Sequence, residues 1–122
     1  PSVPELLQAV KLFIDETAAP NLKGHAAFHA RVASNALATA LRDLEVRPTN
    51  DDKEAARLRT LLNASETASL EEMNRTLCQQ IQSGAITFES SDLLAHLKAT
   101  TIAQVEVDQP RYSGQRTALK TT

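Results

Sequence analysis

Apolar residues recur along this chain at the 3.6-residue period of an α-helix, and the strict alternation typical of β-strands is rare. The first apolar stripe ends before Pro20. Ser2 and Glu5 have the spacing of a capping box, which indicates that the first helix begins near Pro4. The stripe consists of Leu6, Leu7, Val10, Phe13 and Ile14. Residues 4–19 are therefore predicted to form an amphipathic helix.

The second predicted helix is rich in alanine. It follows a short connection at residues 21–24 and is expected to run to about Val46, with a break at Arg47 and Pro48 because a residue that precedes proline avoids the α conformation. Residues 25–43 hold seven alanines, which favour helix and add little bulk, so another helix can approach closely. We expect this helix to lie centrally and to pack antiparallel to the first.

Three more helices are predicted downstream. Residues 49–62 are expected to begin at a capping box formed by Thr49 and Asp52. Residues 70–83 begin after a second such pair, Ser69 and Glu72, and Gly84 provides the C-terminal stop. Residues 91–107 follow cap residues that start at position 90. The sequence thus predicts an all-α fold, an antiparallel bundle of four to five helices.

The C-terminal tail lacks this periodicity. Pro110 and Gly114 disfavour a continued helix, so residues 1–107 are predicted as the helical bundle domain and residues 108–122 as an irregular tail. The tail has two interpretations. It docks as a strap on the bundle, or it is a frayed terminus beyond Gly114.

Composition and charge narrow the function classes. The length of 122 residues suits one domain. An aromatic content of 3% leaves few rings for stacking on a cofactor or a single strand, and a net charge of -2 gives no positive field for nucleic acid. We therefore expect no cofactor and no nucleic-acid partner.

The expected location is the cytoplasm. Cys78 is the single cysteine, so no internal disulfide can form, and we interpret it as a small core residue beside an apolar stripe. No apolar run reaches the ~20 residues of a membrane span or has the pattern of a secretory leader. These features predict no membrane association.

Two histidines on the second helix raise the question of a metal site. His25 and His29 are four residues apart, a spacing that can place two imidazoles beside one metal ion. Position 26 is alanine, where a zinc-protease helix needs glutamate, and a third ligand must come from His96 or a carboxylate. The favoured alternative is that His29, which falls in the apolar arc, is a buried residue bonded to an oxygen atom. No metal is therefore predicted.

A polar line on the same helix suits anion binding. Arg31 and Asn35 lie one turn apart, and a guanidinium beside an amide can grip a carboxylate or phosphate oxygen. The alternative is that Arg31 pairs with an acidic residue and Asn35 bonds a neighbouring loop. In the tail, Arg111 and Tyr112 after Pro110 are either part of such a site or a clip that folds the tail over the bundle.

Two motifs resemble those of a known family. Residues 28–37, FHARVASNAL, and residues 107–112, VDQPRY, look like the recurring motifs of an uncharacterised family of short, all-helical bacterial proteins. The opening PELL at residues 4–7 and LLAHL at residues 93–97 extend the resemblance loosely over most of the chain, with residues 47–69 least similar. Genes of that family often lie beside aminoglycoside-phosphotransferase-like kinases and acyl-CoA dehydrogenases. The resemblance therefore implies a partner enzyme of one of these types.

The chain itself carries no kinase signature. It has no glycine-rich phosphate loop and no HRD or DFG motif. We expect a non-catalytic accessory or interaction protein that acts with such a larger enzyme, as a homodimer through an apolar helix face. A role other than catalysis is thus favoured. The alternative is a small ligand-binding bundle or enzyme with a pocket near His29, Arg31, Asn35 and Tyr112.

Overall fold

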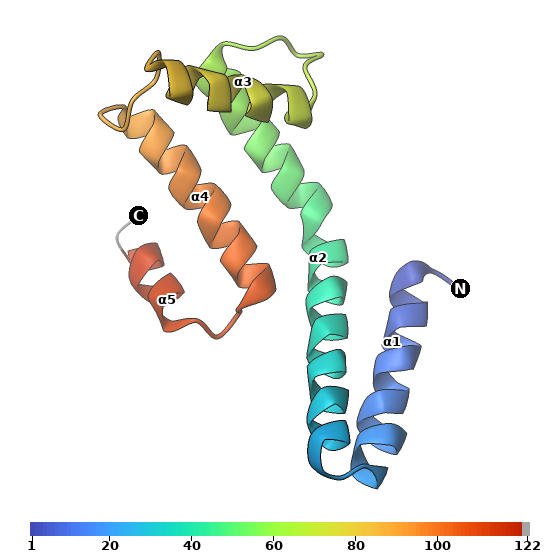
Figure 1. The fold of residues 1–122 in the computed structure, drawn as a ribbon. Helices are drawn as coiled ribbons and strands as arrows, with labels where there is room; N and C mark the ends of the chain where they lie inside the picture. Colours follow the sequence, from blue (N-terminus) through green and yellow to red (C-terminus); the bar gives the residue numbers. More distant parts are fainter. Residues whose placement is uncertain (121–122) are drawn as a thin grey trace. The chain divides into compact units, whose positions relative to one another are not determined.

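The computed structural model describes residues 1–120, which form helices joined by short turns and contain no β-strand (Figure 1). The predicted all-α fold is confirmed. The helices are α1 (Val3–Phe13), α2 (Gly24–Leu62), α3 (Leu70–Ser83), α4 (Ser91–Asp108) and α5 (Ser113–Lys120), with a π-helical turn (Ile14–Ala18) and a 3-10 turn (Ala19–Asn21) after α1. Within these residues no helix combines the length and the apolar character needed to span a membrane.

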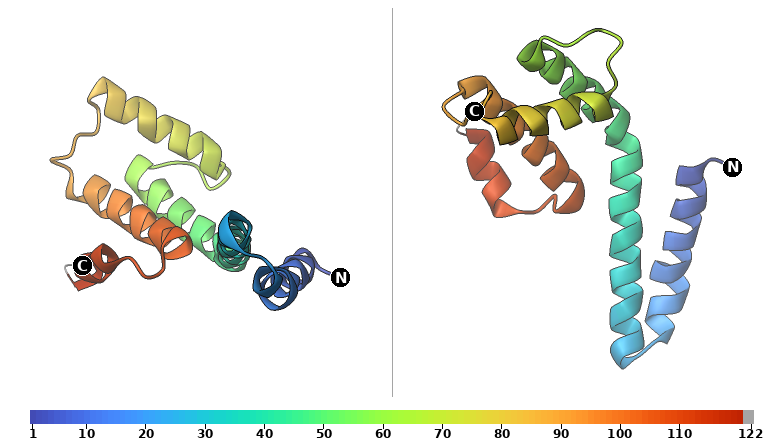
Figure 2. Two further views of the ribbon diagram at one scale, coloured as in Figure 1. Left: turned by 60° about the horizontal axis from the view of Figure 1, so that its bottom comes forward. Right: turned by 45° about the horizontal axis from the view of Figure 1, so that its top comes forward.

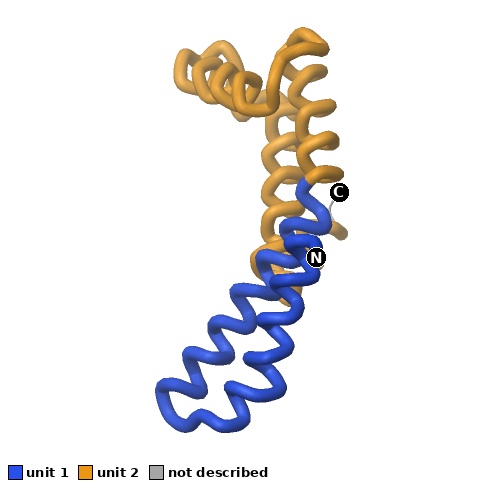
Figure 3. Tube along the Cα trace, turned by 90° about the vertical axis from the view of Figure 1, so that its right-hand side faces the viewer, with its two compact units in different colours: residues 1–47 blue, residues 48–122 orange. Residues whose placement is uncertain are grey.

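The chain divides into two compact units, unit 1 (Pro1–Arg47) and unit 2 (Pro48–Thr122), shown in two colours in Figure 3. Helix α2 contributes residues to both units, and the boundary lies at Pro48. The predicted separation of a bundle domain at residues 1–107 from a tail at residues 108–122 stays a prediction.

Unit 1 is a hairpin of α1 and the first part of α2, which run side by side in opposite directions in Figures 1 and 2. The predicted capping box is present, because Ser2 Oγ accepts from the Glu5 backbone N–H and the Glu5 carboxylate accepts from the Ser2 N–H at 2.7 Å. Across the hairpin, the Ser34 hydroxyl donates to Asp15. Hydrogen bonds from Lys11 and then from Ser34 lower the pKa of the Asp15 carboxyl.

Helix α2 passes through the proline. The expected break at Arg47 and Pro48 is wrong, because α2 extends to Leu62 with Pro48 inside it. Proline removes one N–H donor and crowds the preceding turn at a cost of roughly 3 kcal/mol, which the surrounding helix can absorb. Thr49 and Asp52 are consequently interior helical positions, so the capping box predicted there is wrong too.

Unit 2 contains the hydrophobic core, formed where the second part of α2 meets α3 and α4 (Figure 2). Leu58 is fully buried at its centre. The core consists of Ala55, Leu58, Met73, Leu77 and Leu93. Leu61, Leu62 and Leu70 pack partly buried against this core, whereas Ile81 of α3 and Leu94 and Leu97 of α4 are exposed.

Local stop and start signals fix the ends of the helices in unit 2. Ser69 and Glu72 form the predicted capping box. Gly84 ends α3 in the left-handed conformation at φ 81°, which glycine adopts without steric cost. Asn63 takes a similar conformation after α2, where the Ala64 N–H donates to the Arg59 carbonyl at 3.0 Å.

The C-terminal tail differs from the expectation. An irregular tail and a frayed end beyond Gly114 were predicted, but Ser113–Lys120 is helix α5. Pro110 lies in the turn before this helix, where it breaks no helical bond. Gly114 makes room for the Tyr112 ring, because a Cβ atom at this position would lie 2.5 Å from Tyr112 Cε1. Residues 121 and 122 lie outside the described residues.

The continuity of α2 leads to a first prediction. Pro48→Ala restores the missing N–H donor inside α2 and is expected to raise the free energy of unfolding, by up to roughly 3 kcal/mol, without loss of helical circular dichroism. Pro4→Ala is the control, because Pro4 stands in the first turn of α1, where proline is tolerated. A lower melting temperature for Pro48→Ala would contradict a continuous helix.

Candidate functional site

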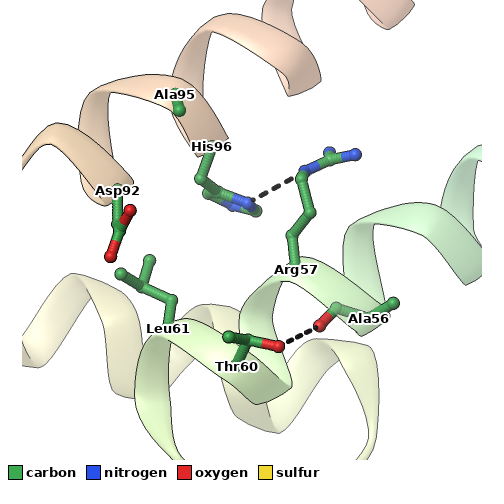
Figure 4. Close-up of a pocket in the computed structure, with 7 residues that line it drawn as sticks. All are labelled: Ala56, Arg57, Thr60, Leu61, Asp92, Ala95 and His96. Carbon is green, nitrogen blue, oxygen red and sulfur yellow. Dashed lines mark hydrogen bonds between the residues drawn. The ribbon is translucent and has the colours of Figure 1, made fainter.

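A polar bridge connects α2 to α4 in unit 2. Arg57 Nε donates to His96 Nδ1 at 3.3 Å (Figure 4). Arg57 Nη2 donates to Thr100 Oγ1 at 3.1 Å. His96 and Thr100 lie one turn apart on α4, so one planar guanidinium reaches both. The bridge therefore holds the Arg57 side chain in a fixed orientation.

His96 is the buried histidine of the described chain, with 3% of its surface exposed. Burial lowers its pKa, the positive charge of Arg57 lowers it further, and the Glu54 carboxylate opposes both effects. Because Nδ1 accepts from Arg57, the ring proton of the neutral form resides on Nε2. At neutral pH the pair thus consists of a cationic arginine and an uncharged imidazole.

A pocket of about 450 Å³ adjoins this bridge. Figure 4 shows its lining side chains on the facing segments of α2 and α4. They are Ala56, Arg57, Thr60, Leu61, Asp92, Ala95 and His96. A second pocket of about 300 Å³ also has Arg57 in its lining, together with residues of α4 and Leu119 of α5. Arg57 is therefore a common wall of two adjacent hollows.

The histidines singled out on the second predicted helix lie in unit 1. His29 is exposed and contacts Phe28 edge to face, with ring centroids 5.6 Å apart, so the predicted burial of His29 is wrong. Buried Ser34, whose hydroxyl donates to Asp15, marks the side of α2 that faces the other arm of the hairpin. His29 is five residues earlier, about 140° around the helix, and His25 is about 180° away, so both face away from that side.

Arg31 and Asn35 are exposed on α2, as predicted. Within the described residues neither side chain makes a hydrogen bond or ion pair, and the alternatives of an acidic partner for Arg31 and a loop bond for Asn35 stay predictions. The Asn35 backbone carbonyl accepts from Thr39 Oγ1 at 3.1 Å. The two side chains are available to a partner or ligand.

Arg111 and Tyr112 lie in unit 2, in the turn between α4 and α5. The Tyr112 backbone N–H donates to the Gln109 carbonyl at 2.9 Å, and its ring packs over Gly114. This arrangement favours the clip interpretation for Tyr112. A pocket that combines Tyr112 with His29, Arg31 and Asn35 stays a prediction, since those three residues belong to unit 1.

The described residues hold no group of three or more histidine, cysteine, aspartate or glutamate side chains that could bind a metal ion. His25 and His29 thus have no third ligand of these types among the described residues.

Cys78 is exposed on α3, so its predicted place in the core is wrong. It lies one position, about 100° of helix, beyond buried Leu77.

The Arg57–His96 bridge was not predicted from the sequence. The two residues are 39 positions apart, and only the packing of α4 against α2 brings them together. A weak signal exists: Arg57 stands between Ala55 and Leu58, which have the spacing of an apolar helix stripe, and His96 is three residues after Leu93. A charged or titratable residue within an apolar stripe often has a polar partner across the helix interface.

One sequence family matches this chain. The profile of the domain of unknown function DUF6285 covers residues 20–112. That range contains Arg31, Asn35, Arg57 and His96, whereas the PELL motif at residues 4–7 lies outside it. Neither a curated protein nor a solved structure matches the chain.

Burial of neutral His96 predicts how stability depends on pH. Its folded-state pKa is below the ordinary value of 6.5, so at lower pH the unfolded chain takes up the proton first. The free energy of unfolding contributed by this site is therefore constant above about pH 6.5 and falls as the pH drops below it. Urea unfolding of His96→Gln is expected to show a flatter pH profile over this range, even if its stability at neutral pH is lower.

His29→Gln provides the matched control, since His29 is exposed on α2. It should keep the pH profile of the unsubstituted protein. Equal slopes for His96→Gln and the unsubstituted protein would show that His96 does not supply this pH dependence.

Proposed function

This chain belongs to the DUF6285 family, and we propose that it is a non-catalytic interaction protein, a homodimer through unit 1, that acts beside a larger cytoplasmic enzyme. The observation that carries this proposal is an uncovered apolar face on the hairpin. In the described chain, Ser34 is the only buried residue of unit 1, so the hairpin has no apolar core of its own.

The apolar face has helical spacing on both elements. On α1, an apolar stripe at steps of three and four residues has side chains that are half or more exposed, from Val3 at 59% to Phe13 at 59%. This stripe consists of Val3, Leu6, Val10 and Phe13. On α2, Phe28 and Val32 lie one turn apart and are 55% and 48% exposed. Half-exposed apolar residues at helical spacing on both helices of the hairpin are typical of an interface.

A second copy of the hairpin is the occupant that this face fits. Two helices from each copy make a four-helix arrangement, which can enclose a core between its helices. Six half-exposed side chains of this size offer on the order of 500 Å² per copy, so a symmetric pair would bury on the order of 1,000 Å². That area meets the lower limit for a specific interface.

The dimer is tested by a charge placed in the face. Light scattering should give the unsubstituted protein a mass of twice the 13.3 kDa chain, whereas Phe13→Asp should give the mass of one chain, because burial of a carboxylate opposes association. Phe88→Asp is the control, since Phe88 is 79% exposed in a turn of unit 2 and should leave the dimer intact. A single-chain mass for the unsubstituted protein at high concentration would overturn the proposal.

The partner enzyme is proposed from the family resemblance. It is of the aminoglycoside-phosphotransferase-like or acyl-CoA dehydrogenase type, and Arg31 and Asn35 are the proposed contacts. Their support is that both side chains are exposed on α2 and make no hydrogen bond or ion pair within the described residues. A guanidinium fork and an amide suit an acidic surface on the partner.

The double variant Arg31→Ala with Asn35→Ala separates recognition from structure. Its free energy of unfolding should stay within about 0.5 kcal/mol of the unsubstituted value, because surface side chains without partners contribute little. Affinity capture from cells of the source organism should recover a kinase or dehydrogenase of the named types with the unsubstituted chain and less with the variant. Arg75→Ala, at an exposed ion pair with Glu71, is the control.

Two results would contradict the proposed contacts. Equal recovery of the enzyme by the double variant would remove Arg31 and Asn35 from recognition. A clear loss of stability in the double variant would give these residues a structural role instead. Capture of neither enzyme type by the unsubstituted chain would contradict the accessory role as a whole, independently of the dimer.

A further inference from the structure

We propose that the pocket beside Arg57 and His96 binds a small organic monocarboxylate with a short apolar body. The site lies within unit 2 and involves none of the residues assigned to association through unit 1. It therefore adds a ligand-binding role that stands or falls separately from the interaction function proposed above.

Arg57 is a half-buried cation without an anionic partner. The described residues place no carboxylate oxygen within ion-pair distance of its guanidinium. Its two hydrogen bonds go to neutral acceptors, an imidazole and a hydroxyl. The nearby Glu54 carboxylate instead accepts from Asn74 Nδ2 at 3.3 Å. Since charged side chains withdrawn from water are usually paired, the site lacks an anion that a ligand can supply.

The guanidinium is held ready for such a ligand. His96 engages Nε and Thr100 engages Nη2, so two of the five N–H donors of Arg57 fix the orientation of its plane. The remaining donors retain the fork geometry that matches a carboxylate. Because α4 already orders this side chain, a ligand pays little further conformational entropy to bind it.

The rest of the lining selects the body and the charge of the ligand. Ala56, Leu61 and Ala95 supply apolar walls, and a pocket of about 450 Å³ lies within the usual range for small-molecule sites. Asp92 stands one turn before His96 on α4 and also lines the pocket. Its negative charge opposes each negative charge on the ligand, so it disfavours a dianion about twice as strongly as a monoanion. The site thus favours a monocarboxylate over a phosphate monoester, which carries close to two charges at neutral pH.

Hexanoate is the probe that tests this assignment, with hexanamide, hexylammonium and hexyl phosphate as its neutral, cationic and dianionic counterparts. Titrated into the full-length chain, hexanoate should give saturable shifts of the Arg57 Nε–H and His96 ring NMR signals and should raise the melting temperature. Each counterpart should bind at least tenfold more weakly. Stronger binding of hexyl phosphate would make the site one for phosphate esters, and stronger binding of hexylammonium would overturn the role of Arg57.

Variants on both sides of the pocket complete the test. Arg57→Gln should weaken hexanoate binding at least tenfold, whereas Arg75→Gln, which removes an exposed arginine of α3, should leave it unchanged. Ala95→Phe keeps the Arg57 charge but fills the pocket, so it should also abolish binding and tests the site even if Arg57→Gln fails to fold. Circular dichroism checks the fold of each variant. Hexanoate binding that survives Ala95→Phe, or no saturable binding by the unsubstituted chain, would overturn the proposal.

Discussion

Two helices that pack side by side cannot hide their apolar side chains from water, and this constraint accounts for the difference between the two units. Unit 1 offers α1 only the first part of α2, so Val10, Phe13 and Phe28 remain about half exposed. Unit 2 adds α3 and α4 to the second part of the same helix, and Leu58 becomes fully buried. A bundle needs a third or fourth helix to close a core. For unit 1, a second copy can supply the missing helices.

The core of unit 2 also explains the placement of its polar site. Arg57 is the neighbour of Leu58, about 100° around α2, so it lies at the rim of the core rather than inside it. From the rim its long side chain reaches α4, where His96 and Thr100 accept its hydrogen bonds. The same packing that buries Leu58 thus orders a guanidinium beside a pocket. Core formation and ligand recognition therefore depend on one helix contact.

Several helix ends that are fixed within one turn could be predicted, whereas the helix through Thr49 and the features that depend on distant contacts could not. Capping boxes at Ser2 and Ser69 and the stop at Gly84 are local, and the structure confirms them. The path of α2 through Pro48 was missed because a proline penalty of roughly 3 kcal/mol is decided by the whole helix. His29 and His96 show the same limit. Each lies on an apolar stripe, but only His96 has another helix against it, and its partner Arg57 is 39 residues away.

The central claim is that unit 1 completes its fold only against another copy of the chain, and native-state hydrogen exchange tests it most directly. Amides of α1 and of α3 are compared in the full-length protein across a dilution series. We predict that protection of α1 falls as the protein is diluted below its dimerisation range, while protection around Met73 and Leu77 stays constant because their core lies within unit 2. Protection of α1 that is equally strong at every concentration would contradict the claim.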